Sequence, residues 1–347
     1  MPRARHRHRS MLVSLSLTLA VALLSSVSTD AAITRNAGKY GTMLYWFYQG
    51  LPASTIYPPT IKWDAHDQAW WNDVVRQARD AGFGWFAANC WGQQTSGPTD
   101  PILRGDPLEL PPLLAAIDAN GGTMKVALFD DTTSEPLRKN IQRHQFFGLT
   151  PKFDLADQDG TGEGGYAFFY EQQWKRFFQT VPDRYRFKIN GRPVIFTWIH
   201  TSSWYDNPES FHTMIDTLRG WTKRDFGFDP FIILEESWLR ADPAVVPDAS
   251  YEWFGPPVFA TVKQYNGIRI GHAIPGYDCH LCPTPGPVVD RQDGRTYRAA
   301  MDAASPGSDL VLVEGFTNAD ENAFLVETST WGRKYLDITR WYVANIP

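Results

Sequence analysis

The sequence predicts an α/β protein with a single (β/α)8 barrel, the TIM-barrel class, built from residues 32–347. Three observations favour this class. Short apolar runs typical of buried strands alternate eight times with longer amphipathic segments typical of helices. The chain has 347 residues, which suits one barrel of this kind. Polar and aromatic residues cluster after nearly every predicted strand, and in this fold the loops after the strands form the active face.

The predicted strands are short runs rich in β-branched and aromatic residues. They cover residues 42–46, 83–88, 124–129, 194–198, 231–234, 249–253, 268–273 and 310–313. The predicted helices carry apolar residues at helical spacing. They cover residues 63–80, 110–119, 170–180, 211–221, 258–265, 296–304 and 334–344.

Helix-breaking residues mark the ends of several elements. Gly82 ends the first helix, Pro111 and Pro112 occupy the first turn of the second, and Gly121 closes it. Gly191 begins the turn into the fourth strand. No linker or low-complexity tract divides the barrel into two domains.

The stretch 308–327 has the sharpest change of character in the chain. Its apolar run 310–313 is followed at once by Glu314, and Asn318, Asp320 and Glu321 come soon after. A buried strand that ends in carboxylates and amides is what the catalytic mouth of a barrel enzyme requires.

Composition excludes some classes of partner. The formal net charge is −5 and the pI is near 5.9, so nothing favours nucleic acid. Aromatic residues make up 14% of the chain, including 14 Trp. They either fill a large core or stack on sugar rings, and the second reading makes a polysaccharide or oligosaccharide the expected partner.

Residues 1–31 have the order of a secretory signal peptide. Four arginines precede an apolar run at 11–24, and small residues follow at 25–32. The run is short for a membrane span, and no later stretch could cross a bilayer. We therefore expect a secreted, extracellular protein that is monomeric and free of the membrane after cleavage.

Three cysteines do not make a disulfide framework by themselves. Cys279 and Cys282 lie in a loop and are expected to form a local disulfide. A zinc site would need two more ligands, and a redox role would need a helix start at the pair. Cys90 is expected to be a small buried thiol.

Several segments resemble glycoside hydrolase family 99 and its polysaccharide-related relatives. They are the aromatic opening LYWFYQG, the run GRPVIFTW, the turn at 275–278 and the segment VLVEGFTNADENAFLVETSTWGRKYL. The resemblance implies a barrel enzyme that hydrolyses α-mannosides or similar α-glycosides with retention of configuration. It also implies endo action, at internal bonds of the saccharide. It also implies two glutamates, one assisting the sugar 2-hydroxyl and one serving as acid/base. Laid over this sequence, the acid/base falls on Glu321, but the assisting glutamate falls on Asn318.

Glycosidic cleavage generally requires two carboxyl groups across the scissile bond. We expect Glu321 to be the acid/base and either Glu236 or Glu314 to be its partner. Glu314 follows its strand so closely that it is either catalytic or locked to an arginine. One member of the pair Glu235 and Glu236 could instead point outward and form a salt bridge.

Further polar and aromatic residues at the predicted strand ends are expected to bind substrate. They are Tyr45, Trp46, Tyr48, Trp91, Asp130, Asp131, His200, Glu235, Trp238, Trp253, Tyr277, Asp278, Asn318 and Asp320. The two aspartates could instead cap a helix, and His200 could be a hydrogen-bonded structural residue. No metal and no cofactor are expected.

Two alternatives to a glycoside hydrolase stay open at this stage. Asn318 suggests a carbohydrate-binding barrel that has lost catalysis. His200 and His272 near strand ends, with aspartates nearby, suggest a metal-dependent hydrolase or deacetylase. The first strand lacks a His-x-His pair, which weakens the second alternative.

Overall fold

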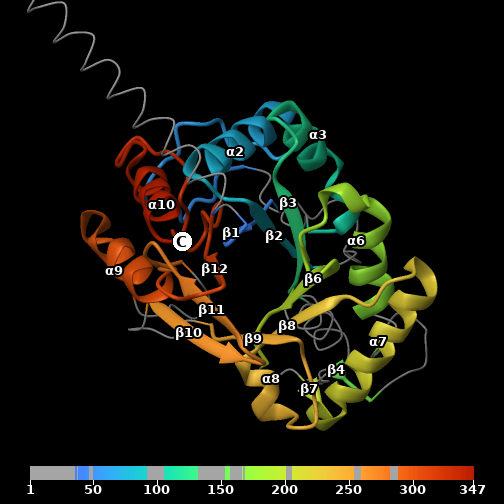
Figure 1. The fold of residues 1–347 in the computed structure, drawn as a ribbon. Coiled ribbons are helices and arrows are strands. Elements are labelled where there is room, and N and C mark those ends of the chain that lie inside the picture. The colour runs from blue at the N-terminus through green and yellow to red at the C-terminus, as the bar shows by residue number, and fades with distance from the viewer. Residues whose placement is uncertain are drawn as a thin grey trace, which may run out of the picture.

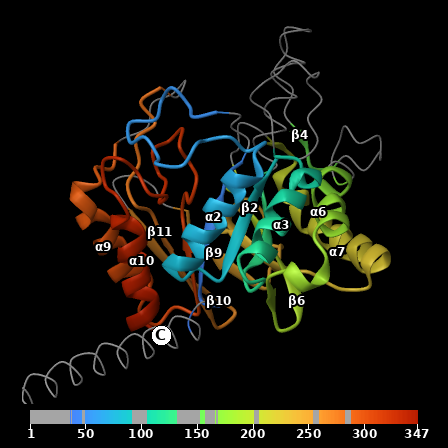
Figure 2. The same ribbon diagram turned by 90° about the horizontal axis from the view of Figure 1, so that it is seen from above.

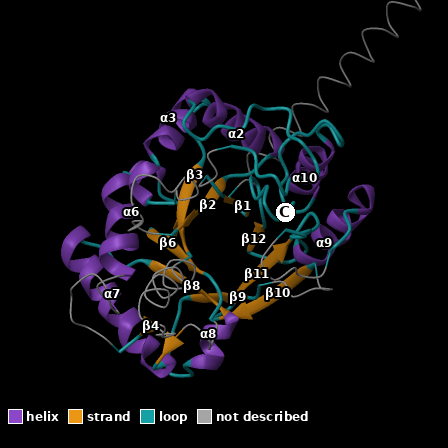
Figure 3. Ribbon diagram, turned by 180° about the vertical axis from the view of Figure 1, so that it is seen from behind, coloured by secondary structure: helices purple, strands orange, loops and turns teal. Residues whose placement is uncertain are grey.

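The computed structural model describes residues 36, 38–46, 50–91, 105–131, 153–156, 166, 169–200, 205–253, 259–281 and 288–347. Their strands form a nearly closed, barrel-like sheet, and the helices surround it (Figure 1; Figure 3). In the view turned by 90°, α2, α3 and α6 lie outside the strands (Figure 2). The coarse prediction of an α/β barrel is confirmed.

The main sheet has the strand order β10-β11-β12-β1-β2-β3-β6-β8-β9. Its neighbours pair in parallel except for β10, which is antiparallel to β11, and β5 adds an antiparallel edge to β6. These strands are β1 (Tyr40–Leu44), β2 (Trp85–Cys90), β3 (Lys125–Asp130), β5 (Lys188–Ile189), β6 (Arg192–Thr197), β8 (Phe231–Glu235), β9 (Ala249–Tyr251), β10 (Ala260–Tyr265), β11 (Ile268–Ala273) and β12 (Leu310–Val313). A separate parallel pair is formed by β4 (Phe153–Asp154) and β7 (Tyr205–Asp206).

The outer layer is helical. It comprises α2 (Gln68–Ala81), α3 (Pro111–Ala119), a π-helical turn (Tyr170–Trp174) leading into α6 (Lys175–Thr180), α7 (Phe211–Phe226), α8 (Glu236–Ala241), α9 (Arg295–Ala304) and α10 (Lys334–Asn345). Asp67 caps α2 through its side chain, and Gly82 ends it in the left-handed conformation. This helix end follows the prediction.

All eight predicted strands are present, but the path of the sheet contains nine. The prediction of a helix at 258–265 is wrong, because that segment contains β10. Asn266 and Gly267 both have positive φ, 49° and 78°, and join Tyr265 to its partner Ile268 in a two-residue turn. An Asn-Gly pair with this geometry is the turn that a tight β-hairpin prefers. The sixth strand is therefore followed by a hairpin and not by a helix.

The inside of the barrel is packed with side chains from alternate strand positions. Trp85 stacks on Phe187 and Phe196, with ring centroids 4.5 and 5.6 Å away. Gly41 makes this stack possible, since a Cβ there would lie 2.1 Å from the Trp85 ring. These residues fill the inside of the barrel, whereas the polar side chains gather at the carboxyl ends of the strands.

Two predictions about chain chemistry are partly answered. Cys90 is a buried free thiol, as expected. Cys279 is disulfide-bonded, and its expected partner Cys282 lies outside the described residues. The predicted signal peptide also lies outside them. No helix in the described ranges is long and apolar enough to span a membrane.

Candidate active site

The loop after β12 folds back over the carboxyl end of the barrel. Gly315, which directly follows Glu314, has φ 74°, and a Cβ there would lie 1.9 Å from the carbonyl oxygen of Ala323. Only glycine fits this turn, so the chain can bring residues 318–321 back beside Glu314.

Asn318 connects two glutamates at this end of the barrel. Its Nδ2 donates to Oε2 of Glu321 at 2.6 Å and to Oε1 of Glu314 at 3.2 Å. Each amide hydrogen therefore serves one carboxyl group. We call these three residues the carboxyl cluster.

Two tyrosines from other strands complete the cluster. The hydroxyl of Tyr45, just after β1, donates to Oε1 of Glu314 at 2.7 Å. The hydroxyl of Tyr277, after β11, donates to Oε1 of Glu321 at 3.2 Å. Thr317 holds the Tyr45 backbone, because its hydroxyl accepts from the Tyr45 N–H and donates to the Tyr45 carbonyl.

The cluster holds protons more tightly than free carboxyl groups do. Burial raises the pKa of Glu314 to about 8; the charges of Glu321 and Asp131 act in the same direction, and the hydrogen bonds from Tyr45 and Asn318 oppose it. Burial also raises the pKa of Glu321. Glu314 has no exposed surface, and its Oε2 has no hydrogen-bond partner in the part of the chain that the structure describes. Glu321 is only partly buried.

Asn322 ties the loop to its neighbours. It has φ 50°, and its Nδ2 donates to the carbonyls of Ser54 and Asp278 at 2.9 Å each. The backbone N–H of Asp278 donates to the carbonyl of Glu321 at 2.9 Å. Asp320, predicted to bind substrate, accepts a hydrogen bond from the Ser54 hydroxyl. Asp278 and Asp320 thus link the loop after β12 to the neighbouring segments at the carboxyl end of the barrel.

The two aspartates after β3 are buried and hydrogen-bonded to side chains from neighbouring segments. Oδ2 of Asp131 accepts from Asn89 Nδ2 at 3.1 Å and from Trp91 Nε1 at 2.8 Å. Oδ2 of Asp130 accepts from Trp174 Nε1 at 2.8 Å. Asp131 lies near enough to the carboxyl cluster for its charge to raise the pKa of Glu314, whereas Asp130 faces the outer core.

Glu235 ends β8 as a buried helix cap. Its Oε2 accepts from the N–H of Ser237 at 2.8 Å and also from the Ser237 hydroxyl, and its Oε1 accepts from the N–H of Trp253 at 3.1 Å. The side chain thus satisfies one backbone donor at the start of α8 and one in the segment after β9.

Glu236 lies apart from the carboxyl cluster. It begins α8, and its two oxygens form ion pairs with Arg240 at 2.8 Å and with Lys263 on β10 at 2.7 Å. None of the hydrogen bonds in the described ranges joins it to Glu314 or Glu321. The structure therefore does not bring this expected catalytic partner to the cluster.

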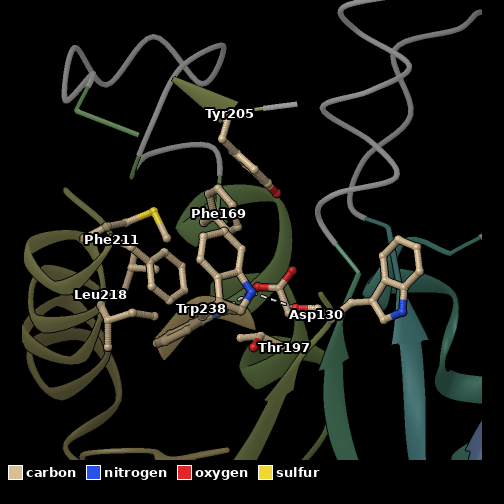
Figure 4. A pocket seen from close by; sticks show the side chains of 11 residues that line it. Asp130, Phe169, Thr197, Tyr205, Phe211, Leu218 and Trp238 are labelled. Atoms are coloured by element: carbon tan, nitrogen blue, oxygen red, sulfur yellow. Dashed lines mark hydrogen bonds between the residues drawn. The ribbon is translucent and has the colours of Figure 1, made fainter. Parts of the chain in front are cut away.

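The predicted aromatic residues divide into core and mouth. Trp46 and Trp238 are almost fully buried; Trp238 stacks on Phe211 at 3.7 Å and lines a cavity of about 10 Å³, room for about one water (Figure 4). His200 packs against the edge of the Trp238 ring at 5.0 Å, and burial lowers its pKa. Neither tryptophan has a face free for a sugar.

Trp91 and Trp253 are partly buried at the mouth, packed on the barrel interior. Trp198, after β6, lies there too, with its ring centroid 6.2 Å from that of Trp253 in an edge-to-face arrangement. Trp198 is the last residue of the predicted strand 194–198 and follows β6 directly in the structure, so its place at a strand end is a local signal for this position. Tyr48 lies outside the described residues.

Two further residues of the site take part through contacts that only the fold creates. Asn89, which directly follows the predicted strand 83–88, supports Asp131, and Thr317 supports Tyr45. In the described ranges, no three His, Cys, Asp or Glu side chains gather as a metal ion would require.

The family model described as "Domain of unknown function (DUF5010)" matches residues 23–347. The chain belongs to the DUF5010 family. No curated protein matches the sequence.

Solved structures similar to this DUF5010 chain include the GH99 endo-alpha-mannosidase from Bacteroides thetaiotaomicron in complex with BIS-TRIS-Propane. That match has a TM-score of 0.57 and 16% identity, and it covers 88% of this chain and 96% of the other. Another structure of that enzyme has a TM-score of 0.56, 14% identity and the same coverage. A glycoside hydrolase-like protein has a TM-score of 0.55 and 14% identity, covering 87% and 93%. The predicted resemblance to glycoside hydrolase family 99 is confirmed as a likeness of fold.

Proposed function

We propose that this protein is an exported glycoside hydrolase that cleaves α-linked bonds in an oligosaccharide or polysaccharide. Glu321 serves as acid/base, and Glu314 is the second carboxyl group. The observation that carries the proposal is the bridge by Asn318 between two carboxyl groups with raised pKa values at the carboxyl end of the barrel. Barrel enzymes carry their chemistry at this end.

The spacing of the pair supports cleavage with retention. Glu314 Oε1 and Glu321 Oε2 each lie within a hydrogen bond of one nitrogen, at 3.2 and 2.6 Å. Their separation cannot exceed the sum of these distances. It is therefore closer to the ~5–5.5 Å between carboxyl groups of retaining glycosidases than to the ~6.5–9.5 Å of inverting ones.

The protonation of the pair suits acid/base catalysis. Burial raises the pKa of both carboxyl groups, so each keeps its proton to a higher pH than a free glutamate does. Glu321, the partly exposed member, donates its proton to the glycosidic oxygen as the bond breaks and later takes one from the attacking water. The negative charge left on the pair stabilises the positive charge that develops at the anomeric carbon. A bell-shaped pH profile is expected.

The surroundings of the cluster supply a sugar-binding face. Trp91, Trp198 and Trp253 lie partly buried at the mouth, and aromatic faces of this kind stack on the C–H surfaces of sugar rings. The similar structures include a GH99 endo-alpha-mannosidase and a glycoside hydrolase-like protein. The signal peptide predicted at residues 1–31 favours export to the surroundings of the cell, where polysaccharides occur.

The decisive experiment is a screen of the purified mature chain against a panel of α-linked oligosaccharides and polysaccharides, followed by the variant Glu321→Gln. Release of reducing ends by the wild type is expected, with a loss of about 10²–10⁴-fold in the variant, the usual contribution of one acid/base group. Full activity in Glu321→Gln would falsify the assignment.

A second candidate function is a carbohydrate-binding barrel without turnover. Asn318 favours it, because the family 99 resemblance places a glutamate there, and so does the complete burial of Glu314. Titration calorimetry showing oligosaccharide binding, with no reducing ends formed in prolonged incubation, supports this function. Any reducing-end release that Glu321→Gln abolishes rules it out.

A further inference from the structure

The geometry points to Arg291 as a positioning residue that fixes Glu321 by holding the backbone of the loop after β12. The inference rests on the proposed function only for what Glu321 does; the positioning itself is a matter of contacts. Arg291 follows the segment 288–290 and precedes α9. Its side chain belongs to no part of the carboxyl cluster.

Arg291 is a buried cation with an unusual set of partners. It is 3% exposed, and nowhere in the described ranges does it form an ion pair with a carboxylate. Instead, its guanidinium lies over three aromatic rings, with centroids at 4.5 Å for Tyr335, 5.2 Å for Tyr57 and 5.4 Å for Phe324. Burying a charge without a counter-ion costs several kcal/mol unless hydrogen bonds and ring faces offset it. The contacts that offset this cost therefore show what Arg291 stabilises.

The hydrogen bonds of Arg291 go to the loop that carries Glu321. Its Nη2 donates to the carbonyl of Asn322 at 2.8 Å and to the carbonyl of Phe324 at 2.7 Å. One nitrogen thus grips two carbonyls of the segment directly after Glu321. The turn at Asn322 has positive φ, and these bonds hold it against relaxing.

Arg291 also supports the second residue that holds Glu321. A Cβ on Gly276 would lie 2.5 Å from Cγ of Arg291, so the backbone before Tyr277 rests on the arginine stem. Tyr277 and Val289 exchange both backbone hydrogen bonds, at 2.9 and 2.8 Å. The hydroxyl of Tyr277 donates to Glu321. Arg291 therefore lies where the two segments that orient the Glu321 carboxyl meet.

The chain contains a matched control at the opposite end of the barrel. Arg186 donates to the carbonyls of Val181 and Phe178, both at 2.8 Å, and lies 5.2 Å from the rings of Phe178 and Phe228. It shares the chemistry of Arg291, apart from a long ion pair to Asp183 at 3.7 Å, but it has no connection with Glu321. A loss of stability common to both sites can be separated from a loss of positioning.

The test compares Arg291→Met, Arg291→Lys and Arg186→Met by thermal melting, by hydrogen exchange of peptides covering 314–325 and 231–241, and by the pH profile of kcat and kcat/KM. We expect both methionine variants to melt earlier. Only Arg291→Met should speed exchange of 314–325 by tenfold or more with 231–241 unchanged, lower kcat about tenfold and shift the pH profile. Arg291→Lys should restore part of each effect.

The outcomes separate this inference from the proposed function. If the wild type cleaves no sugar, the proposed function fails, and exchange at 314–325 still decides the positioning role. Unchanged exchange in Arg291→Met, or an equal change of exchange and pH profile in Arg186→Met, overturns the inference. If Arg291→Met does not fold, Arg291→Lys decides: normal exchange and a normal pH profile overturn the inference, and faster exchange limited to 314–325 supports it.

Discussion

The strands β12 and β8 carry similar acidic residues at their carboxyl ends, but the backbone that follows each strand takes a different course. Each strand is buried, and acidic residues stand at its carboxyl end. After β12 these are Glu314 and Glu321; at β8 they are Glu235, the last residue of the strand, and Glu236, the first residue of α8. After β12, Gly315 turns the chain back over the mouth, and the two glutamates meet across Asn318. After β8, helix α8 starts at once.

Because α8 starts directly after β8, Glu235 and Glu236 make contacts that stabilise this helix and its neighbours. Glu235 caps the helix through its side chain, and Glu236 points to Lys263 and Arg240. The comparison teaches that a carboxylate after a barrel strand is not by itself a catalytic candidate. The backbone that follows the strand decides whether the carboxyl group meets another carboxyl group or a donor that neutralises it.

The largest expected effect that tests this comparison is on the pH dependence of stability. The folded pKa of Glu314 is raised to about 8 from a usual 4.5, so the folded protein keeps a proton that the unfolded chain releases. The stability that this group contributes is complete below about pH 4 and is lost as the pH rises toward 8. Relative to the wild type, Glu314→Gln should gain on the order of 4 kcal/mol between pH 4 and 9.

Denaturant unfolding at pH 4, 6 and 9 measures this difference. Glu236→Gln is the matched control and should follow the wild-type pH dependence. Parallel curves for the wild type and Glu314→Gln would contradict the raised pKa of Glu314.

The second effect is that of the bridge on activity. Asn318→Ala removes one donor shared by Glu314 and Glu321, and losing a hydrogen bond to a carboxylate raises its pKa. We expect the acidic limb of the kcat profile to move to higher pH and kcat to fall about tenfold, a loss near 1.4 kcal/mol. A profile that keeps its wild-type shape contradicts the role of the bridge.

A third, smaller effect belongs to the β8 side. Glu235→Ala leaves the backbone N–H groups of Ser237 and Trp253 without their acceptor, which costs about 1–3 kcal/mol for buried donors. Melting temperature should fall, while the pH profile of kcat stays that of the wild type. A shifted profile would place Glu235 in the chemistry and blur the contrast between the two strand ends.

The smallest effect is expected for Glu236→Gln. Its ion pairs with Arg240 and Lys263 are partly exposed, and such pairs contribute about 0–1 kcal/mol. Stability and activity should both stay close to the wild type. A loss of activity of a hundredfold or more would restore Glu236 as the catalytic partner.

The sequence by itself determined the local elements. Eight of the nine strands along the path of the sheet follow from apolar runs, and the end of α2 follows from Gly82. Strand and helix periods and turn residues act over only a few positions. The hairpin of β10 and β11 was also within reach: the Asn266-Gly267 pair marks it, and the helical reading of 258–265 overlooked that turn. The nearness of Asn318 to Glu321, three residues apart, is likewise local.

The tertiary structure decided which carboxyl groups meet and what surrounds them. Tyr45 and Glu314 are 269 residues apart in sequence and share a hydrogen bond only because β1 and β12 are neighbours in the sheet. Arg291 likewise binds Asn322 and Phe324, which are 31 and 33 residues away in sequence, because the fold brings the segment before α9 against the loop after β12. Burial sets the pKa of Glu314, and burial depends on every segment packed around a side chain. No local pattern contains that information. The sequence could propose the glutamates, and only the fold could show that Glu314, and not Glu236, is hydrogen-bonded to the asparagine that binds Glu321.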